Sequence, residues 1–579
     1  MEQIEKTTSQ ALEKVGIGET KIEISYPTNS DFGDYTTNVA LQIAKKLHRN
    51  PFELAQEIAS HIPTDATIQK VQVVQPGFIN FWLQDAVYQT ELHKILEKKD
   101  TYGHSNAGNG KKWLIEHTSP NPNKAMHLGH LRNNVTGMAI ANLWDAVGIE
   151  VIRDCIDNNR GIAIAKLMWG YLKFAKKEPQ LPTTLEYWYG HQSQWNTPTE
   201  ANTSPDKFVD QLYVKASEDF KDKDVEAAVR QMVIQWENGD EKNRALWKKV
   251  LDFSHHGQAQ TYARLGNHFD KVWHEDEHYQ LGKDIVHEGL QKRVFKKLED
   301  GAVLSQLEAY NLPDTIIIKS DGTSLYITQD IALTKLKKDT FNPDKLHWVV
   351  GPEQTLALKQ LFAICEQLGI AKREDLIHIP FGWMSLKGKG KMSSRTGNVV
   401  YIEDLLDDAK TELLQLNFTA QDKERVAEIL AVGAVKYSIL KVGRTTDTAF
   451  DFQTSLSLEG DSGPYLQYTY ARCQSILSQS NHSLSVTMAA TTTNEELAIM
   501  RHLIKFASVI ENSAYQYAPN LLCSYLFELA QKFNFFYQKS PVLKAEEQTR
   551  LFRLQLTAAV AQVLKNGLSL LGIETAEKI

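Results

Sequence analysis

The sequence predicts an α/β protein whose central domain has a parallel sheet, with an α+β domain before it and an all-α domain after it. Near residue 113 a buried strand pattern precedes a loop and a long helix, which is typical of a nucleotide-binding α/β unit. Strand patterns return after residue 310, and from about residue 410 the pattern is helical to the end. The 579 residues suffice for roughly three or four domains.

Composition indicates a globular enzyme. Hydrophobic residues make up 42% and charged residues 23% of the chain, so neither disorder nor a fibrous repeat is indicated. The formal net charge of −7 excludes a histone-like polycation but allows a local basic groove for nucleic acid. The N-terminus lacks a signal-peptide pattern, and no apolar run approaches the ~20 residues that span a bilayer. We therefore expect a cytoplasmic protein without membrane association.

The cysteines point to the same compartment. Four thiols in a chain of this length, with no CxxC spacing, predict a reducing environment and no zinc or other protein metal site. They are Cys155, Cys365, Cys473 and Cys523.

Residues 1–105 are expected to form a separate α+β domain. A helix pattern covers Asn38–Leu47, and strand patterns cover Gln69–Val74 and Phe78–Leu83. The stretch Asp100–Lys112 is rich in glycine, asparagine, serine and charge, which is typical of a domain boundary.

Residues 106–405 are expected to form a Rossmann-like domain with a parallel sheet. Trp113–His117 predicts a strand, Thr118–Met126 a loop and His130–Val147 a helix. Residues 166–265 interrupt this pattern with less regular helices and four prolines, which indicates an inserted helical subdomain. The α/β pattern then resumes. Two predicted strands, Thr315–Lys319 and Ser324–Ile327, are joined across Asp321-Gly322. Two later strands, Leu346–Val350 and His378–Met384, flank a predicted helix at Leu356–Leu368.

Residues 406–579 are expected to form an all-α bundle. Helical patterns cover Arg425–Leu440, Tyr465–Leu477 and Arg550–Leu571. The serine-, threonine- and asparagine-rich stretch 480–494 predicts a loop between two of these helices.

His127 and His130 are the first candidates for catalysis, because they lie at i and i+3 where a helix is expected to begin. Unpaired backbone N–H groups at a helix start suit phosphate, and Gly129 lets a nucleotide base stack close to the backbone. Two imidazoles can donate hydrogen bonds to a triphosphate as negative charge develops. A pair of surface histidines is the alternative interpretation.

A basic, glycine-containing segment at 388–398 is the second candidate. Its cations, Lys391 above all, can reach a leaving pyrophosphate, and its glycines permit the loop to close over ATP. We assign Met392 and Ser393 to ATP binding within the same segment. A solvated basic turn is the alternative. Taken together, the two segments imply adenylyl transfer.

The two motifs, His-Leu-Gly-His and Lys-Met-Ser-Ser-Arg, resemble the paired signatures of class I aminoacyl-tRNA synthetases, and the sequence around them resembles the arginyl-tRNA synthetase family. The resemblance implies an extra N-terminal domain that binds the tRNA elbow and a C-terminal anticodon-binding bundle. Four segments carry it in the same order along the chain: Phe32–Ala40, Gln75–Phe81, Glu116–Pro122 and Glu459–Arg472.

Selection of arginine requires carboxylates that face a planar guanidinium, a geometry that rejects the compact ammonium of lysine. Asp330 follows Tyr326 by four residues, and the family motif assigns both to the guanidinium. Glu275 resembles a second carboxylate of this pocket, with a solvated acidic turn as the alternative. Asn121 and Gln354 match the family's amides for the substrate α-amino and carboxylate groups, although the residues alone would predict a turn and a helix start.

Three positions depart from the family pattern. The closing loop has Ser394-Arg395 where many class I enzymes have a second lysine, and Lys124 matches an upstream lysine that reaches the triphosphate instead. Asn159 stands where relatives usually have aspartate. The last residues, 577–579, lack the methionine-ending tail common in the family, which puts any contact made by the C-terminus in doubt.

Two groups of residues are candidates for tRNA contact, because unpaired bases are bound by aromatic stacking and amide hydrogen bonds. Core packing is the alternative for the aromatic residues in both groups. The N-terminal group is Gln75, Phe78 and Asn80, and the C-terminal group is Tyr465, Tyr468 and Arg472.

The resemblance implies an arginine–tRNA ligase that uses ATP with Mg²⁺, forms arginyl-adenylate and esterifies the 2′-hydroxyl of the terminal adenosine of tRNA(Arg). It also implies that tRNA binds before arginine is activated. A class I enzyme for another amino acid, such as lysine, and an inactive tRNA-binding paralogue are the alternatives. The intact motifs, with Asp330 beside Tyr326, favour the arginine enzyme, which we expect to act as a monomer.

Overall fold

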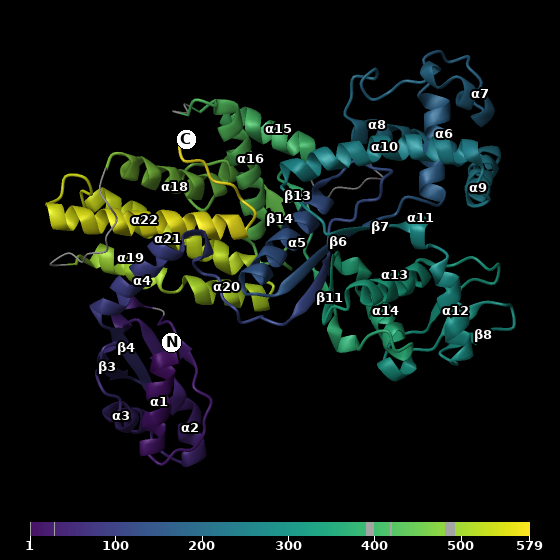
Figure 1. Cartoon of the computed structure of the whole chain (residues 1–579). Coiled ribbons are helices and arrows are strands. Elements are labelled where there is room, and N and C mark those ends of the chain that lie inside the picture. The colour runs from purple at the N-terminus through teal and green to yellow at the C-terminus, as the bar shows by residue number, and fades with distance from the viewer. Residues whose placement is uncertain (1, 28, 389–398, 417–419, 481–491) are drawn as a thin grey trace.

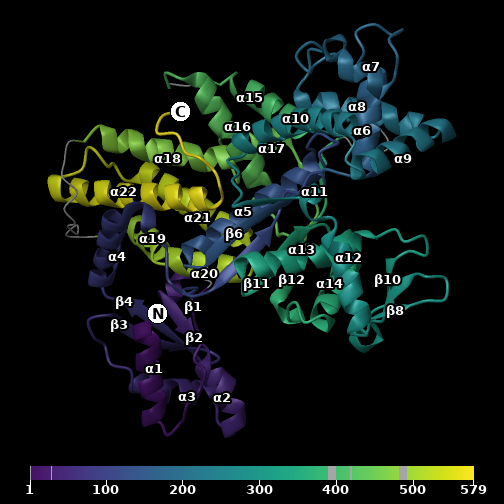
Figure 2. The ribbon, with the colours of Figure 1, turned by 45° about the vertical axis from the view of Figure 1, so that its right-hand side comes forward.

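The structure is a computed structural model that describes residues 2–27, 29–388, 399–416, 420–480 and 492–579. Lys391, Met392 and Ser393 lie outside the described residues, as does most of the loop predicted at 480–494. The N-terminal domain and the helical insertion lie at opposite ends of the molecule, with the parallel sheet between them (Figure 1). Figure 2 shows the same arrangement from a second direction.

The N-terminal domain packs three helices against a four-stranded antiparallel sheet with strand order β1-β2-β4-β3. The predicted helix and both predicted strands of this domain are confirmed. Asn50 fixes the start of α3, since its side chain accepts the N–H of Phe52 at 2.9 Å and Pro51 occupies the first helical position. The elements are α1 (Glu2–Lys14), β1 (Ile24–Ser25), β2 (Tyr35–Thr37), α2 (Val39–Leu47), α3 (Pro51–Ser60), β3 (Ile68–Val74) and β4 (Phe78–Leu83).

The central, Rossmann-like domain is built on a five-stranded parallel sheet with strand order β12-β11-β5-β6-β7. The order reverses between β5 and β11, and open α/β sheets bind ligands beyond the carboxyl ends of the strands at such a switch point. The parallel sheet and its place in the chain confirm the predicted fold class. The elements are β5 (Lys112–Glu116), α5 (Leu128–Ala146), β6 (Glu150–Asp157), β7 (Lys271–His274), α13 (Tyr326–Phe341), β11 (Lys345–Val350), α14 (Thr355–Gln367) and β12 (Leu376–Pro380).

The insertion is helical, as predicted, and has its own hydrophobic core, in which Trp188 and Trp195 are fully buried. It consists of α6 (Ile162–Phe174), α7 (Leu185–Gly190), α8 (Pro205–Asp219), α9 (Lys223–Glu237) and α10 (Glu241–Arg264). A smaller unit between β7 and α13 has two helices and an antiparallel three-stranded sheet, made of α11 (Glu275–His278), α12 (Leu281–Gln291), β8 (Phe295–Lys297), β9 (Val303–Ser305) and β10 (Thr315–Ile318).

The C-terminal part is a helix bundle, as predicted. Its core is continuous with that of the N-terminal domain and of α5, and α4 (Asp85–Lys98) packs against α22. The parallel pair of β13 (Met384–Leu386) and β14 (Thr448–Phe450) connects the Rossmann-like domain to the bundle. The helices are α15 (Ile402–Leu413), α16 (Lys423–Leu440), α17 (Phe452–Ser455), α18 (Gly463–Ser478), α19 (Asn494–Leu503), α20 (Phe506–Tyr515), α21 (Pro519–Lys539) and α22 (Glu547–Leu570).

Two predicted strands were wrong. The pattern at Ser324–Ile327 gives only one bridge, between Ile318 and Ser324, because α13 begins at Tyr326. The strand predicted at His378–Met384 is divided into β12 and β13. The chain turns at Gly382, where an added Cβ would lie 2.7 Å from the backbone of Thr446, so only glycine fits this close approach.

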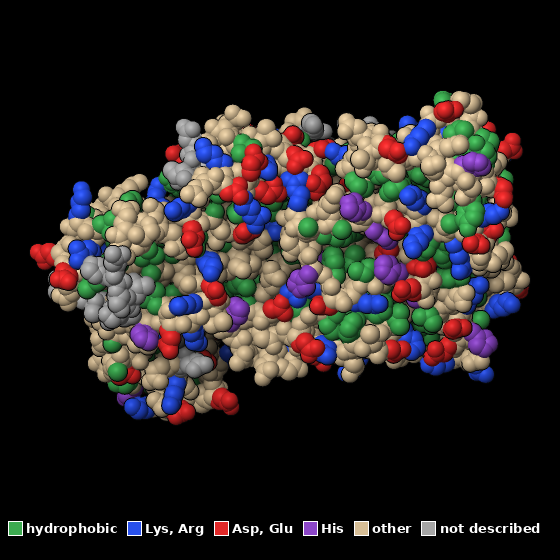
Figure 3. Space-filling view, turned by 45° about the horizontal axis from the view of Figure 1, so that its top comes forward, with side chains coloured by type: hydrophobic (Ala, Val, Ile, Leu, Met, Phe, Trp, Pro, Cys, Tyr) green, Lys and Arg blue, Asp and Glu red, His purple; other side chains and the backbone are tan. Residues whose placement is uncertain are grey.

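Charges of both signs are interspersed over the face shown in Figure 3, which agrees with the small net charge of the chain. Among the described residues, no helix has the length and apolar content needed to cross a bilayer. All four cysteines are buried as free thiols.

Candidate active site

Two adjoining cavities lie at the switch point of the parallel sheet. The first, of about 680 Å³, is lined by the start of α5, the residues after β11 and the β13–β14 region. The second, of about 390 Å³, is lined by the ends of β5, β6 and β11 and by α11, α13 and α14. Val350 and Gln354 belong to both linings. A molecule in one cavity can therefore react with a molecule in the other at this shared boundary.

The two predicted histidines form one unit at the start of α5. His127 is the N-cap residue, and its Nδ1 accepts the Gly129 N–H at 3.1 Å, while Nδ1 of His130 accepts the His127 N–H at 3.2 Å. The rings stack with centroids 4.0 Å apart. Since each Nδ1 is an acceptor, each neutral ring carries its proton on Nε2. Both rings can thus donate a hydrogen bond to a phosphate oxygen.

Both histidines are neutral at neutral pH. Burial, together with the nearby Lys124 ammonium, lowers the pKa of His127 to about 4, and burial with the His127 ring lowers the pKa of His130 well below its usual value. An added Cβ at Gly129 would lie 3.0 Å from Cε1 of His127, so a side chain there would crowd the ring. The helix start thus offers donors and an open backbone without a full positive charge.

The ends of the segment that contains Lys391 lie beside the histidines. Leu128 donates its N–H to the Val400 carbonyl at 3.2 Å, and Ile402 donates to the Met126 carbonyl at 3.0 Å. Ser385 before the segment and Val399 after it line the larger cavity together with His127. The contact of Lys391 with ATP stays a prediction, since the residue is outside the described part. Lys124 is described, and its ammonium lies 5.6 Å from the Tyr213 ring centroid.

Arg132 and Trp383 were not predicted from the sequence. Arg132, one turn after the histidines, is almost fully buried and donates to the carbonyls of Trp383 and Arg444, each at 3.0 Å, and to that of Thr446 at 2.6 Å. It therefore fixes the wall of the larger cavity on which Trp383 is half exposed. An arginine within a helix carries no sequence signal for this role, whereas the string Phe-Gly-Trp-Met after a strand indicates an aromatic wall.

Three predicted arginine-binding residues meet in the smaller cavity. Tyr326 and Asp330 lie one turn apart on α13, as predicted, and Glu275 begins α11 across the cavity. The Tyr326 side chain is 90% exposed at the mouth. Asp330 is exposed to the open cavity, but the protein walls around its carboxyl group partly desolvate it and raise the pKa of Asp330 to about 7, with Glu116 and Glu275 acting in the same direction and Lys337 opposing it.

A buried ionic triad forms the floor of this cavity. Lys337, on the same helix as Asp330, lies 2.6 Å from Glu116 and 2.7 Å from Asp154, and all three side chains are at most 7% exposed. The triad places two carboxyl groups and one ammonium beneath Asp330, and burial raises the pKa of Glu116 while Lys337 opposes this shift. Trp273 also donates to Asp154 at 2.7 Å. A lysine in a helix normally reaches solvent, so the burial of Lys337 could not be predicted from the sequence around it.

The two predicted amides occupy different positions. Gln354 lies at the boundary between the cavities. Asn121 lines neither cavity directly, but its side-chain oxygen accepts a hydrogen bond at 2.9 Å from Asn158, which does line the smaller one. Asn158 and Ser119, which accepts the Ile156 N–H at 3.0 Å, were not predicted as site residues. Both occur in segments that the sequence analysis singled out.

Asn159 is paired within the site. Its amide nitrogen donates to Asp276 Oδ1 at 2.5 Å, and its oxygen accepts the Asp276 N–H at 3.0 Å. An aspartate at position 159 would place two carboxylates against each other. The neutral Asn159 side chain avoids this repulsion and exchanges two hydrogen bonds with Asp276.

Three family models match successive parts of the chain. Residues 2–83 match "Arginyl tRNA synthetase N terminal domain", residues 91–170 and 191–452 match "tRNA synthetases class I (R), catalytic domain", and residues 466–579 match "DALR anticodon binding domain". The chain belongs to the arginyl-tRNA synthetase family. The resemblance inferred from the sequence is confirmed.

Relatives within the arginyl-tRNA synthetase family match over nearly the whole length. The arginine–tRNA ligase of Bacteroides fragilis is 32% identical over 95% of each chain, and that of Treponema denticola is 34% identical over 96% of this chain and 95% of its own. The solved arginyl-tRNA synthetase of Thermus thermophilus has a TM-score of 0.83 at 23% identity and covers all of both chains. That of Plasmodium falciparum has a TM-score of 0.79 at 21% identity over 100% of this chain and 99% of its own.

The N-terminal residues predicted for tRNA contact differ in exposure in this arginyl-tRNA synthetase family member. Gln75 is exposed just before the turn that leads to β4, and Phe78, the first residue of β4, is 36% exposed. Asn80 is only 3% exposed within the sheet, where it pairs with Thr36 and Gln72. Gln75 and Phe78 can therefore meet a base directly, whereas contact by Asn80 requires the sheet to open locally.

The C-terminal residues predicted for tRNA contact form one group on α18. The Arg472 guanidinium lies 4.9 Å from the Tyr468 ring centroid and donates to Asn534 Oδ1 at 2.5 Å, and Asn534 donates to the Tyr465 hydroxyl at 3.0 Å. Tyr468 and Arg472 line a cavity of about 670 Å³, as do the last residues, 577–579. The atypical C-terminus is therefore adjacent to the predicted anticodon surface.

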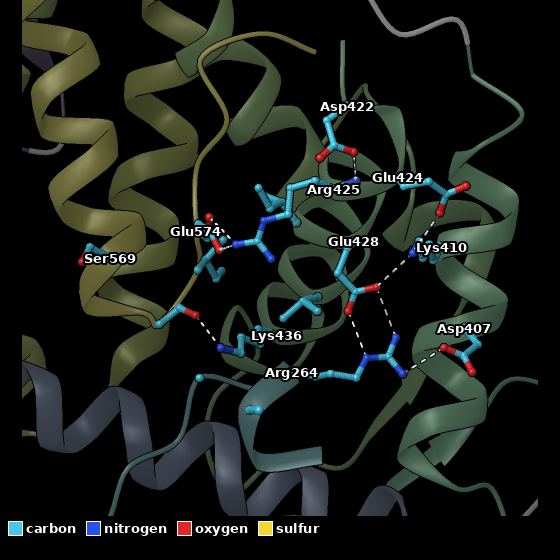
Figure 4. Close-up of a pocket in the computed structure, with 16 residues that line it drawn as sticks. Arg264, Asp407, Lys410, Asp422, Glu424, Arg425, Glu428, Lys436, Ser569 and Glu574 are labelled. Carbon is cyan, nitrogen blue, oxygen red and sulfur yellow. Dashed lines mark hydrogen bonds and ion pairs between the residues drawn. The ribbon is translucent and has the colours of Figure 1, made fainter. Parts of the chain in front are cut away.

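A further cavity, of about 920 Å³, lies where the end of α10 meets α15, α16 and the C-terminal tail (Figure 4). Charged side chains of both signs line it, and several of them are paired. Arg264 pairs with Glu428 at 3.0 Å, and Arg425 forms a two-pronged contact with Glu574 at 2.7 and 2.8 Å. Lys436 donates to the Leu265 carbonyl at 2.8 Å. We assign this cavity to the junction between domains.

Proposed function

We propose that the chain is an arginine–tRNA ligase that activates arginine with ATP and transfers it to tRNA(Arg). The observation that carries this proposal is the shared boundary of the two cavities at Gln354. On one side lie the Nε2 donors of His127 and His130, and on the other lie the carboxylates of Asp330 and Glu275. A guanidinium in the acidic cavity directs the substrate's carboxylate toward a triphosphate in the other.

In the first step, an oxygen of the arginine carboxylate attacks the α-phosphorus, the bond to the β-phosphate oxygen breaks, and pyrophosphate leaves. His127 and His130 donate to the triphosphate, and Lys124 and Lys391 balance the charge of the leaving group. Gly129, Met392 and Ser393 complete the ATP site. Mg²⁺ would accompany ATP and neutralise charge on its phosphates, and Glu353 and Asp447, which line the larger cavity, would supply carboxylate oxygens of the type that Mg²⁺ prefers.

In the second step, the 2′-hydroxyl of the terminal adenosine attacks the carbonyl carbon of the adenylate, and AMP leaves. We propose that tRNA binds before activation, with residues 1–105 on the elbow, residues 106–405 on the acceptor end and residues 406–579 on the anticodon. Gln354, at the boundary of the cavities, and Asn121, which lines neither cavity without a ligand, are the amides that we assign to the α-amino and carboxylate groups of arginine. The residues that contact tRNA are Gln75, Phe78, Asn80, Tyr465, Tyr468 and Arg472.

Arginine-dependent exchange of pyrophosphate into ATP, measured with and without tRNA(Arg), tests the activity. We expect exchange only with tRNA present, and none when lysine replaces arginine. No exchange in either condition would refute the ligase and favour an inactive tRNA-binding paralogue. Exchange with lysine would reassign the amino acid, and exchange without tRNA would refute only the binding order.

We further propose that the enzyme acts as a monomer in the cytoplasm, where charged tRNA is used. Light scattering of the purified chain tests the first point, and a mass of twice 65.6 kDa would refute it. Fractionation of the source cells tests the second.

A further inference from the structure

Two segments at the carboxyl edge of the parallel sheet are joined residue by residue. The first follows β6, and the second is the junction of β7 with α11. Three pairs connect them: Asp157 Oδ2 lies 2.8 Å from His274 Nδ1, Asn159 exchanges two hydrogen bonds with Asp276, and Arg160 Nη1 lies 3.6 Å from Glu275 Oε1. The carboxylate predicted to bind the substrate guanidinium is thus part of a built interface.

The same three residues also contact the helical insertion. Each uses a different partner on α9 or α10. Asp157 lies 3.0 Å from His255 Nε2, the main-chain oxygen of Asn159 accepts from Trp247 Nε1 at 2.5 Å, and Arg160 forms an ion pair with Glu237. Segment 157–160 is therefore a bridge between the insertion and the arginine cavity.

Arg160 is the member of this bridge that contacts Glu275, the carboxylate predicted to bind the substrate guanidinium. Its guanidinium lies 4.0 Å from the Tyr279 ring centroid and 5.7 Å from that of Trp236, and its side chain is only 12% exposed. Aromatic faces and two carboxylates fix a planar guanidinium more tightly than one ion pair does. The Glu275 side chain stays 20% exposed beside Arg160 and lines the cavity, so an incoming guanidinium can still reach it.

The charge of Arg160 does not cancel the attraction for arginine. Glu237 contacts Arg160 more closely than Glu275 does, so the group of three side chains keeps one net negative charge at the cavity. Burial raises the pKa of Glu275, and Arg160 opposes this shift. Loss of Arg160 would remove both the partner that orients Glu275 and the charge that favours its ionised form.

We propose that Arg160 is a positioning residue for arginine recognition, which holds Glu275 at the cavity and anchors it to the helical insertion through Glu237 and Trp236. The proposal rests on the proposed function, because the position of Glu275 matters only if arginine is the substrate. It implies that α9, which lines no part of the arginine cavity, contributes to arginine affinity.

Three single variants of the full-length chain test this, Arg160→Met, Arg160→Lys and Glu237→Gln, together with the double variant of Arg160→Met and Glu237→Gln. Arg160→Met should raise the arginine KM in pyrophosphate exchange, and the arginine Kd by calorimetry without ATP, about tenfold or more, with the ATP KM within about twofold of wild type. Arg160→Lys keeps the charge but loses the planar fork, so its arginine KM should lie between those of wild type and Arg160→Met. Glu237→Gln should raise the arginine KM by about threefold or more, and Arg160→Met with Glu237→Gln should be no worse than Arg160→Met alone.

The pH profile separates positioning from general damage. In Arg160→Met the pKa of Glu275 should rise further, so arginine KM should fall with increasing pH more steeply than in wild type. Arg230→Met is the matched control, because Arg230 is on α9, as Glu237 is, but its side chain is 58% exposed and forms an ion pair with Glu226 of the same helix. Its arginine KM should equal that of wild type.

Equal changes in arginine KM and ATP KM, or no change in either, would overturn the proposal. If Arg160→Met does not fold, an unchanged arginine KM in Glu237→Gln overturns it. Wild-type exchange is measured first: its absence would refute the proposed function, whereas wild-type exchange with unaltered variants would refute only the role of Arg160.

Discussion

Replacement of Asp330 by asparagine should disable arginine recognition while leaving ATP recognition intact. Asp330 lies on α13 in the smaller cavity, together with Glu275 and above the triad of Lys337. Asparagine has nearly the same shape and keeps one acceptor oxygen, so the cavity does not collapse. What it loses is the charge and the second acceptor that a guanidinium fork requires.

The magnitude follows from the position of Asp330. Asp330 is exposed to the open cavity and would be covered by the bound guanidinium, and a hydrogen bond to a charged group contributes about 1.5–3 kcal/mol, so a two-pronged contact should be at the upper end, about 3 kcal/mol. Each 1.4 kcal/mol is about tenfold, which predicts a roughly hundredfold loss in kcat/KM for arginine. The ATP KM should stay within about twofold, because Asp330 is not in the lining of the larger cavity.

The assay is pyrophosphate exchange with tRNA(Arg) present, at varied arginine and then at varied ATP. Asp339→Asn is the matched control, because Asp339 is on the same helix, is 61% exposed and pairs with Lys335 only at the surface. A loss below about threefold in Asp330→Asn, or the same loss in Asp339→Asn, would refute the assignment.

The pH dependence of the same variant is a second readout. The pKa of Asp330 is about 7 in the folded chain, above the ordinary value of 3.8, so the free enzyme binds arginine better as pH rises through 7. Asp330→Asn should lack this increase in arginine affinity with pH. The folded state also holds this proton more tightly than the unfolded state, so Asp330 lowers the free energy of unfolding as pH rises from about 4 to 7. Without arginine at pH 8, Asp330→Asn should therefore melt above wild type.

His127→Asn should lower kcat of exchange by about 10²–10³ with little change in arginine KM, because a transition-state donor is lost. Since the pKa of His127 is about 4, a wild-type rate that titrates with this ring between pH 6 and 8 in the free enzyme would contradict that reasoning. Lys337→Met leaves Glu116 and Asp154 as unpaired buried carboxylates and should destabilise the chain by about 3–5 kcal/mol in denaturant unfolding; an unchanged midpoint would contradict the buried triad. Phe78→Ala should weaken tRNA binding by about 1–3 kcal/mol while arginine binding without tRNA is unchanged, and equal tRNA affinity would exclude base stacking.

The sequence predicted those parts of the fold in which one local pattern determines the element. The strand at Trp113–His117 is an apolar run before a loop, and the observed β5 differs from it by one residue at each end. The helix predicted at His130–Val147 is also observed, but it begins two residues earlier, at Leu128, after the N-cap residue His127. The order of domains followed from the same patterns along the chain.

The remaining features depend on contacts between distant segments. Strand β6 contains Arg153, Asp154 and Asp157, a polar content that does not indicate a buried strand. It is buried because Asp145, Lys337 and His274 neutralise these charges from three other elements. No periodicity reports such pairing, and for the same reason the positions of Lys337, Arg132 and Asn158 could not be predicted.

One helix organises the arginine cavity. Tyr326, Asp330 and Lys337 all lie on α13, so its rotation places the phenol at the mouth, the carboxylate on the wall and the ammonium in the floor. The floor then holds Glu116 and Asp154 with a single cation. Desolvation by the cavity walls is the main reason that ionisation of Asp330 is unfavourable without a ligand, and the carboxyl groups of Glu116 and Glu275 add to this effect while Lys337 opposes it. A guanidinium would bring positive charge to these carboxyl groups, so the same carboxyl groups that help to raise the pKa of Asp330 also favour a cationic substrate.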